Sequence, residues 1–326
     1  MGRPFCLYRR VIHVQMGTKG GAMTDSTKGV LAMFIACCVW GLSPLYYAQL
    51  KHVPPVEVLS YRCMWSLIFF VLILLVQRRL YLVWQALRSG RNVLVILMAG
   101  LMISINWFLY IFAIANGQAL ESSLGYYIFP LVAVVLGRVV FAERLSRMQG
   151  AAVAMAAVAV LTLAVGLGVP PWIALILAGT FGMYGLIKKK LDVGPVVSVT
   201  GEVLLLSPLA IGWIYLRGTG GELGHAWDTQ ALLAFSGPLT ATPLILFSYA
   251  ARRARLSTLG LVQYVNPTLQ FACAVFVFGE PFTPWHGIAF PLIWLALALY
   301  SLSVLRQDRA ARKASVSADT SSTTVT

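Results

Sequence analysis

Apolar positions along this chain gather in long runs that short polar stretches separate. A membrane-spanning helix needs about 20 mainly apolar residues, because the hydrocarbon core is about 30 Å thick and each helical residue rises about 1.5 Å. Ten runs are candidates for such spans: residues 28–47, 56–76, 92–115, 120–141, 148–167, 171–187, 196–216, 230–250, 257–278 and 285–305. The pattern therefore predicts an all-α polytopic membrane protein with ten transmembrane helices.

The stretches between the runs are too short to form a soluble domain, and several contain helix breakers such as Pro54-Pro55 and Pro170-Pro171. Residues 1–27 contain no apolar stretch of the length found in a signal peptide. We predict that this N-terminal extension is disordered or that the true start is Met16 or Met23 and not Met1. Residues 306–326 are predicted to form a basic and then Ser/Thr-rich cytoplasmic tail.

Composition supports lipid as the solvent, since 59% of residues are hydrophobic and 11% are charged, against about 45–50% and about 25% in soluble domains. The net charge of +14 does not indicate nucleic acid, because the basic residues lie in clusters between the runs. With both termini in the cytoplasm, every Lys and Arg falls on the inner side except Lys51 and Arg217 outside and Arg62 within a span. This distribution follows the positive-inside rule and predicts the orientation.

Two halves of the chain share a pattern. Pro130 precedes Glu143 by thirteen positions, and Pro267 precedes Glu280 by the same number. Upstream, Ser123-Leu124-Gly125 matches Thr258-Leu259-Gly260, with two extra residues before the second proline; Trp40-Gly41 matches Phe181-Gly182. Residues 28–167 and 171–305 are therefore predicted to be two copies of a five-helix unit. Five is odd, so the copies have opposite orientations, as in many secondary transporters with a substrate site at the repeat interface.

Several short motifs resemble those of the EamA-domain proteins in the drug/metabolite transporter superfamily, and in particular the RarD type, which is named for chloramphenicol sensitivity. The residues that carry the resemblance are Val39-Trp40-Gly41-Leu42-Ser43-Pro44, Tyr61-Arg62, Asn106-Trp107, Leu120-Glu121-Ser122-Ser123-Leu124-Gly125-Tyr126-Tyr127, Pro130-Leu131, Tyr184-Gly185-Leu186, Glu202, Leu256-Ser257-Thr258-Leu259-Gly260, Gln263-Tyr264 and Pro267-Thr268. The resemblance covers about residues 23–310. It implies two inverted EamA repeats, the bacterial inner membrane, and export of small molecules such as drugs or metabolites.

Ionisable residues within spans are costly and are functional candidates by default. Arg62 and Glu202 lie equally far into the second and seventh spans from opposite faces, so we predict a pair between them, direct or through substrate. A structural ion pair, or Arg62 reaching outer headgroups, is the alternative. Glu143 and Glu280 end their spans at equivalent points and are expected to hold the repeat geometry.

Amide and aromatic side chains within spans are expected to face other helices or a cavity, because lipid offers them no partner. The candidates for substrate binding or translocation, besides Arg62 and Glu202, are Asn106, Trp107, Tyr126, Tyr127, Tyr184, Gln263, Tyr264 and Asn266. Interhelical hydrogen bonds are the alternative for each. Pro44, Pro130 and Pro267 are candidate hinges or static kinks.

The sequence contains no HExxH, P-loop or Ser/His/Asp grouping and no CxxC pair, so we predict no enzyme, cofactor or metal site. The expected function is secondary transport of small organic molecules by alternating access. A channel or lipid scramblase, or a non-transporting sensor or assembly factor, is the alternative. The expected partners are a substrate, protons and membrane lipids, and no nucleic acid; a monomer suffices, while a homodimer remains open.

Overall fold

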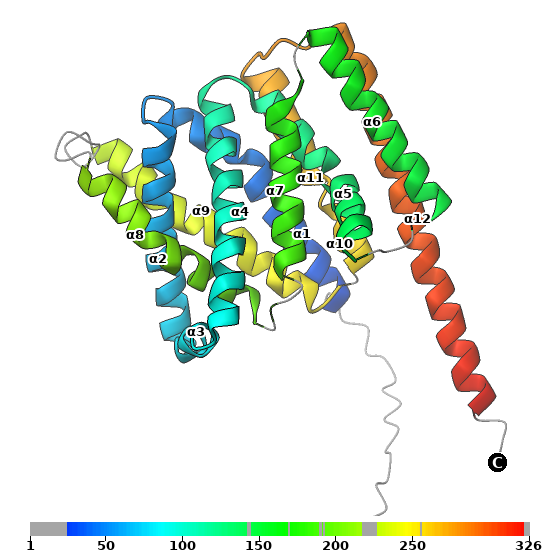
Figure 1. The fold of residues 1–326 in the computed structure, drawn as a ribbon, viewed down its shortest axis with the longest axis horizontal. Helices are drawn as coiled ribbons and strands as arrows, with labels where there is room; N and C mark the ends of the chain where they lie inside the picture. Colours follow the sequence, from blue (N-terminus) through cyan, green and yellow to red (C-terminus); the bar gives the residue numbers. More distant parts are fainter. Residues whose placement is uncertain are drawn as a thin grey trace, which may run out of the picture.

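The computed structural model of the protein describes residues 25–141, 145–168, 170–188, 191, 193–216, 227–254 and 256–322, and within them every regular element is a helix (Figure 1). The helices are α1 (Asp25–Tyr47), η1 (Ala48–Leu50), α2 (Pro55–Val76), α3 (Tyr81–Leu87), α4 (Gly90–Ala115), α5 (Ala119–Phe141), α6 (Arg147–Leu167), α7 (Trp172–Lys188), α8 (Pro195–Leu216), α9 (Trp227–Ala251), α10 (Leu256–Val262), α11 (Val265–Ala272), η4 (Cys273–Val277) and α12 (Pro284–Ser322). The N-terminal extension, except for the residues from Asp25, and Glu143 lie outside the described residues.

Nine segments among the described residues are long and apolar enough to cross a membrane. The sixth predicted span is the apolar helix α7, which has 17 residues. At about 1.5 Å per residue it is about 26 Å long, slightly shorter than a hydrocarbon core of about 30 Å. The all-helical membrane class is therefore confirmed, whereas the count of ten spans stays a prediction.

The ninth predicted span is not one continuous α-helix, which corrects the prediction for 257–278. Thr258–Val277 is a candidate span, but α10 ends at Val262, α11 begins at Val265, and η4 continues as a π-helix. Gln263 and Tyr264 form the break. The N–H of Gln263 still bonds to the oxygen of Leu259 four residues back, whereas the N–H of Tyr264 bonds to the oxygen of Leu261 three residues back.

Two helical segments lie outside the predicted spans. The connection after the second span contains the short helix α3, which packs on α4 and α8. The last predicted span, 285–305, agrees with the candidate span Pro284–Gln307, but the helix α12 continues to Ser322 and projects beyond the other helices (Figure 1). The predicted tail at 306–326 therefore begins as a helical extension of the last span.

Two half-buried carboxylates accept hydrogen bonds from the first backbone N–H groups of a helix to which they do not belong. Glu280 accepts the N–H groups of Ala119 and Leu120 at the start of α5, both at 2.7 Å. Burial raises the pKa of Glu280, while these N–H groups act in the opposite direction. Glu121 accepts the N–H of Ile173 at the start of α7 at 2.9 Å. Each carboxylate meets N–H groups that have no partner within the helix and the positive end of the helix dipole.

Helices of the first five predicted spans pack on helices of the last five in matching pairs. α1 packs on α9 and α11, and α7 packs on α4 and α5. α2 packs on α9, and α4 packs on α8. α6 and α12 lie side by side at one edge of the bundle (Figure 1). If α1 corresponds to α7 and α5 to α10–α11, each of these contacts has a counterpart of the same kind.

Glycines allow two of these pairs to approach closely. A Cβ on Gly41 of α1 would lie 2.7 Å from the Cβ of Leu269 in α11. A Cβ on Gly125 of α5 would lie 2.9 Å from the backbone oxygen of Ala174 in α7. Small residues at such contacts are typical of helix packing in membranes, where close backbone approach replaces the hydrophobic effect between helices.

The outer faces of the bundle remain apolar. Leu161 and Val165 of α6 are 63% and 78% exposed, and Leu209 of α8 is 70% exposed. Extended exposed apolar surfaces are rare on monomeric soluble proteins and mark membrane or protein contacts. These exposed apolar side chains, together with the length of the apolar helices, indicate that lipid surrounds the bundle.

Candidate substrate-binding cavity

A cavity of about 450 Å³ lies between the helices of the bundle, and residues from α1, α2, α4, α5 and α7 to α11 line it. This volume is within the range of about 300–1,000 Å³ that small-molecule sites occupy. No described residue of α6 or α12 belongs to the lining. The cavity lining thus comes from eight of the ten predicted spans.

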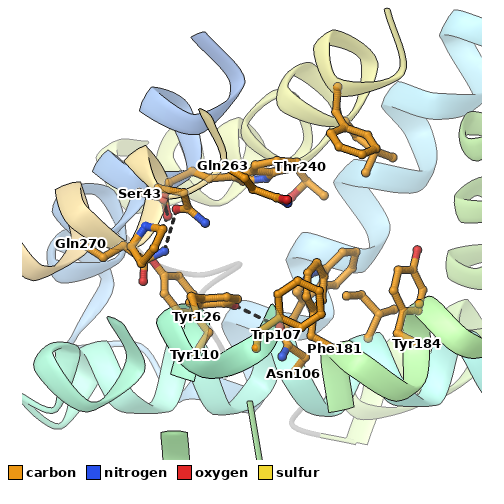
Figure 2. Close-up of a pocket in the computed structure, with 18 of the residues that line it drawn as sticks. Ser43, Asn106, Trp107, Tyr110, Tyr126, Phe181, Tyr184, Thr240, Gln263 and Gln270 are labelled. Carbon is orange, nitrogen blue, oxygen red and sulfur yellow. Dashed lines mark hydrogen bonds between the residues drawn. The ribbon is translucent and has the colours of Figure 1, made fainter. Parts of the chain in front are cut away.

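One wall of the cavity is aromatic and comes from α4, α5 and α7 (Figure 2). The ring of Phe181 lies 6.2 Å from that of Tyr126, edge to face, and is stacked 6.0 Å from that of Tyr184. Trp107 and Tyr110 extend this wall along α4. Rings that contact one another form a continuous apolar surface, which suits a flat ligand.

Asn106 holds this wall in place. The side chain is 1% exposed, and its Oδ1 accepts a hydrogen bond from the hydroxyl of Tyr126 at 3.0 Å. Its Nδ2 donates to the backbone oxygen of Leu177 at 2.9 Å and to Thr180 Oγ1 at 3.2 Å. One amide therefore joins α4, α5 and α7, as expected for a polar group in an apolar interior that needs all its partners.

The opposite wall carries polar side chains among apolar ones, with Ser43, Thr240, Gln263 and Gln270 facing the aromatic side (Figure 2). Ser43 Oγ donates to the backbone oxygen of Trp40 at 2.6 Å and shares a 2.8 Å hydrogen bond with the hydroxyl of Tyr110. Pro44 has no N–H for that same Trp40 oxygen, since it lies four residues further along α1. The serine thus repairs the hydrogen bond that the proline removes.

The amides of α11 form the rest of the polar wall. Gln270 Nε2 donates to Asn266 Oδ1 at 2.9 Å, and Gln270 is 2% exposed. Its Oε1 is buried with no hydrogen-bond partner. A buried acceptor without a partner is costly, and this oxygen is an unsatisfied polar group beside the cavity.

Arg62 of α2 brings a positive charge into the cavity wall. The residue is 7% exposed, and its Nε–H donates to Thr240 Oγ1 at 3.0 Å. Its guanidinium carbon lies 4.1 Å from the ring centre of Trp107 and 5.7 Å from that of Tyr47. Cation–π contacts and one hydrogen bond therefore hold the guanidinium at the edge of the aromatic wall.

Glu202 pairs with Lys188 and not directly with Arg62, which corrects the direct form of the predicted pair. Lys188 Nζ lies 2.9 Å from Glu202 Oε1, and Ser198 Oγ donates to the same oxygen at 2.8 Å. The hydroxyl of Tyr184 donates to Glu202 Oε2 at 3.1 Å. Glu202 is 0% exposed and is not part of the cavity lining, whereas its partners Lys188 and Tyr184 are.

Most of the predicted substrate-contacting residues line the cavity: Arg62, Asn106, Trp107, Tyr126, Tyr184, Gln263, Tyr264 and Asn266. Glu202 stands behind the wall, and Tyr127 faces away. The Tyr127 hydroxyl shares a 2.9 Å hydrogen bond with Thr268, and its ring packs edge-on against Phe290. Tyr127 therefore joins α5 to α11 and α12.

The candidate hinges have different surroundings. Pro44 lies in the last turns of α1 and outside the cavity lining, whereas Pro130 lies inside α5 and lines the cavity. Pro267 also lines the cavity, but it is the third residue of α11, where a helix has no hydrogen bond for its N–H. The break in this span thus lies at Gln263 and Tyr264, upstream of the proline.

Part of the lining was not predicted from the sequence: Trp40, Ser43, Tyr47, Tyr110, Phe181, Lys188, Thr240 and Gln270. The predicted repeat offered a signal for two of them, because the aromatic residue before the glycine in Trp40-Gly41 and in Phe181-Gly182 lines the cavity. Lys188 follows Tyr184 by four positions and so shares its helix face. Its place in a run of three lysines indicated topology alone. Among the described residues no group of three His, Cys, Asp or Glu side chains could hold a metal ion.

The fold and the cavity define a multi-pass helical membrane protein with a central site of small-molecule size. The chain belongs to the EamA-like transporter family, whose sequence profile matches residues 27–165. It is 42% identical over 294 residues to protein RarD of Streptomyces exfoliatus, covering 89% of this chain and 93% of the relative. It is 38% identical to the uncharacterized transporter YojE of Bacillus subtilis strain 168, covering 88% and 98%.

A relative in Pseudomonas aeruginosa, named chloramphenicol-sensitive protein RarD, is 29% identical over 85% of this chain and 94% of its own length. Among solved structures, one crystal structure superposes with a TM-score of 0.57 at 19% identity, covering 87% of this chain and 99% of the other. The structural likeness supports the fold. The relatives identify a membrane protein of a transporter family and confirm the resemblance seen in the motifs.

Proposed function

We propose that this protein is a secondary carrier that exports a small organic molecule across the inner membrane of a bacterium by alternating access. The cavity of about 450 Å³ between the two halves carries the proposal. Aromatic rings on one side and amides on the other suit an amphipathic, partly flat ligand. The bacterial relative YojE, which is named a transporter, and the EamA-like transporter family support the membrane and the class of function.

The proposed architecture has ten spans in two inverted five-helix repeats, residues 28–167 and 171–305, with both termini in the cytoplasm. The matching packing pairs of the two halves support the repeats. The clusters of Lys and Arg support the orientation. In such folds, rocking of one repeat against the other opens the central site to each side in turn.

A channel or a scramblase would pass its substrate without an enclosed intermediate, and a sensor would pass none. A carrier instead shows flux that saturates and that unlabelled substrate on the opposite side accelerates. The first probe is labelled chloramphenicol in proteoliposomes of the full chain, with and without a pH gradient. Saturable flux with acceleration from the opposite side supports a carrier; linear flux without acceleration contradicts it.

Coupling to protons is a separate part of the proposal. Glu202 is the candidate acceptor because it is a fully buried carboxylate directly behind the cavity wall. Proton uptake would have to separate it from Lys188, which lies 2.9 Å away. Arg62→Ala and Glu202→Gln are each expected to abolish flux while the protein remains inserted in the membrane. If Glu202→Gln transports normally and still responds to the pH gradient, Glu202 is not the coupling group.

A further inference from the structure

The charges that line the cavity do not balance. Arg62 and Lys188 are its two cationic residues, and no described residue of the lining is Asp or Glu. Lys188 has its counter-charge directly behind the wall, since Glu202 lies 2.9 Å away. Arg62 has no such carboxylate in the lining. The cavity wall therefore carries one positive charge that the lining leaves uncompensated.

Arg62 is held so that part of its guanidinium remains for a ligand. A guanidinium has five N–H donors, and the bond to Thr240 Oγ1 uses the one on Nε. Among the described residues, no other side chain or backbone group bonds to its two terminal nitrogens. These nitrogens form a planar fork that matches the two oxygens of a carboxylate. The Trp107 ring, 4.1 Å from the guanidinium carbon, fixes the plane of the fork.

An uncompensated charge inside a membrane bundle is unfavourable and is kept where function needs it. A bound anion would compensate the charge of Arg62, while a bound cation would add to the repulsion. The aromatic wall of Trp107, Tyr126 and Phe181 lies next to this charge and offers a flat apolar surface. The two features together describe a ligand with an anionic end and a planar body.

We infer that the cavity binds a small organic acid, with its carboxylate on the terminal nitrogens of Arg62 and its planar apolar body against the aromatic wall. The inference rests on the proposed function, because it names the substrate class of the same cavity. An anionic substrate would also determine the driving force for export. The interior of a bacterial cell is electrically negative, so the membrane potential itself drives an anion outward. Export of such a substrate needs no coupled proton.

The test compares acids with their neutral amides, which have nearly the same shape. Binding to the purified full chain in detergent is measured for benzoate and benzamide, 3-phenylpropionate and 3-phenylpropanamide, and indole-3-acetate and indole-3-acetamide. At least one acid is expected to bind at least tenfold more tightly than its amide. Arg62→Gln is expected to remove that preference, and Arg62→Lys to keep part of it because the charge remains.

Arg306→Gln is the matched control, since Arg306 is exposed on α12 and outside the cavity lining. It is expected to keep the preference for the acid. Equal binding of acids and amides in the native protein, including no binding of either, would overturn the inference. So would a preference for acids that survives in Arg62→Gln.

Flux measurements separate this inference from the proposed function. Saturable flux of an amide or of chloramphenicol, with no preference for acids, would leave the carrier standing and remove the organic acid as its substrate class. Acid-selective binding that depends on Arg62, with no flux of the bound acid in proteoliposomes, would support the site and contradict the carrier. Potential-driven flux of the acid that Arg62→Gln abolishes supports both.

Discussion

α5 and α10–α11 have the same motif and different structures. Both contain Ser/Thr-Leu-Gly, then a proline, but Gly260 and Pro267 are two residues further apart than Gly125 and Pro130. Two extra residues would turn a continuous α-helix by about 200° and move every later side chain to the opposite face. In this segment the helix is interrupted at Gln263 and Tyr264, between α10 and α11, whereas α5 remains one helix.

The glycine and the proline of the shared motif therefore have different surroundings in α5 and in α10–α11. Gly125 is packed against the backbone of α7, while Gly260 has no atom within 4 Å of its Cβ position and lines the cavity. Pro130 lies inside a continuous helix, while Pro267 stands in the first turn of one. α5 is thus part of the packed frame and also lines the cavity with Tyr126, Phe129 and Pro130, while α10–α11 contributes Gly260 and amides to the site. Broken spans at the binding site are common in transporters with inverted repeats.

Removal of the two extra residues is the strongest way to break this comparison. Deletion of Gln263 and Tyr264 is expected to join α10 and α11 into one helix like α5 and to reduce flux to the level of empty liposomes. Replacement of both residues by alanine keeps the chain length and is expected to retain part of the flux. Substantial flux in the deletion variant, measured at equal amounts of inserted protein, would show that the break is not needed.

Alanine at the two equivalent glycines is expected to have opposite effects on stability. In Gly125→Ala the new Cβ would lie 2.9 Å from the Ala174 backbone oxygen, and overpacking of this kind costs about 1–3 kcal/mol. Gly260→Ala meets no atom, and better helix propensity is expected to stabilise α10 by up to about 1 kcal/mol. Unfolding of both variants in SDS measures the difference. Equal destabilisation would contradict the assignment of α5 to the packed frame.

The two prolines provide the smallest and sharpest test. Pro130→Ala is expected to restore one backbone hydrogen bond inside α5 and to raise the free energy of unfolding by about 1 kcal/mol. Pro267→Ala restores none, because an N–H in the first turn has no partner within the helix. Melting temperatures of the purified variants compare the two. A gain at Pro267 equal to that at Pro130 would mean that α11 does not begin where the structure places it.

The candidate site was predictable in part. Arg62 stood out because a charge within an apolar run is rare, and it does line the cavity. The predicted pairing of Arg62 with Glu202 compared only how far each residue lies along its own helix. That comparison did not include Lys188 at the end of α7, which forms the ion pair with Glu202. Tyr126 and Tyr127 are neighbours in the sequence but point about 100° apart on the helix, so one faces the cavity and the other faces α11 and α12.

The sequence by itself determined the membrane class, nine long spans to within a few residues, and the family. Transfer of an apolar segment from water to lipid is a local quantity that depends on the segment alone. Only the tertiary structure decided which face of each helix meets lipid and which meets the cavity. Lipid tails and neighbouring helices are both apolar, so a span carries little amphipathic signal for its orientation. The two extra residues before Pro267 were visible in the sequence, but only the structure showed that the chain accommodates them by interrupting the helix at Gln263 and Tyr264.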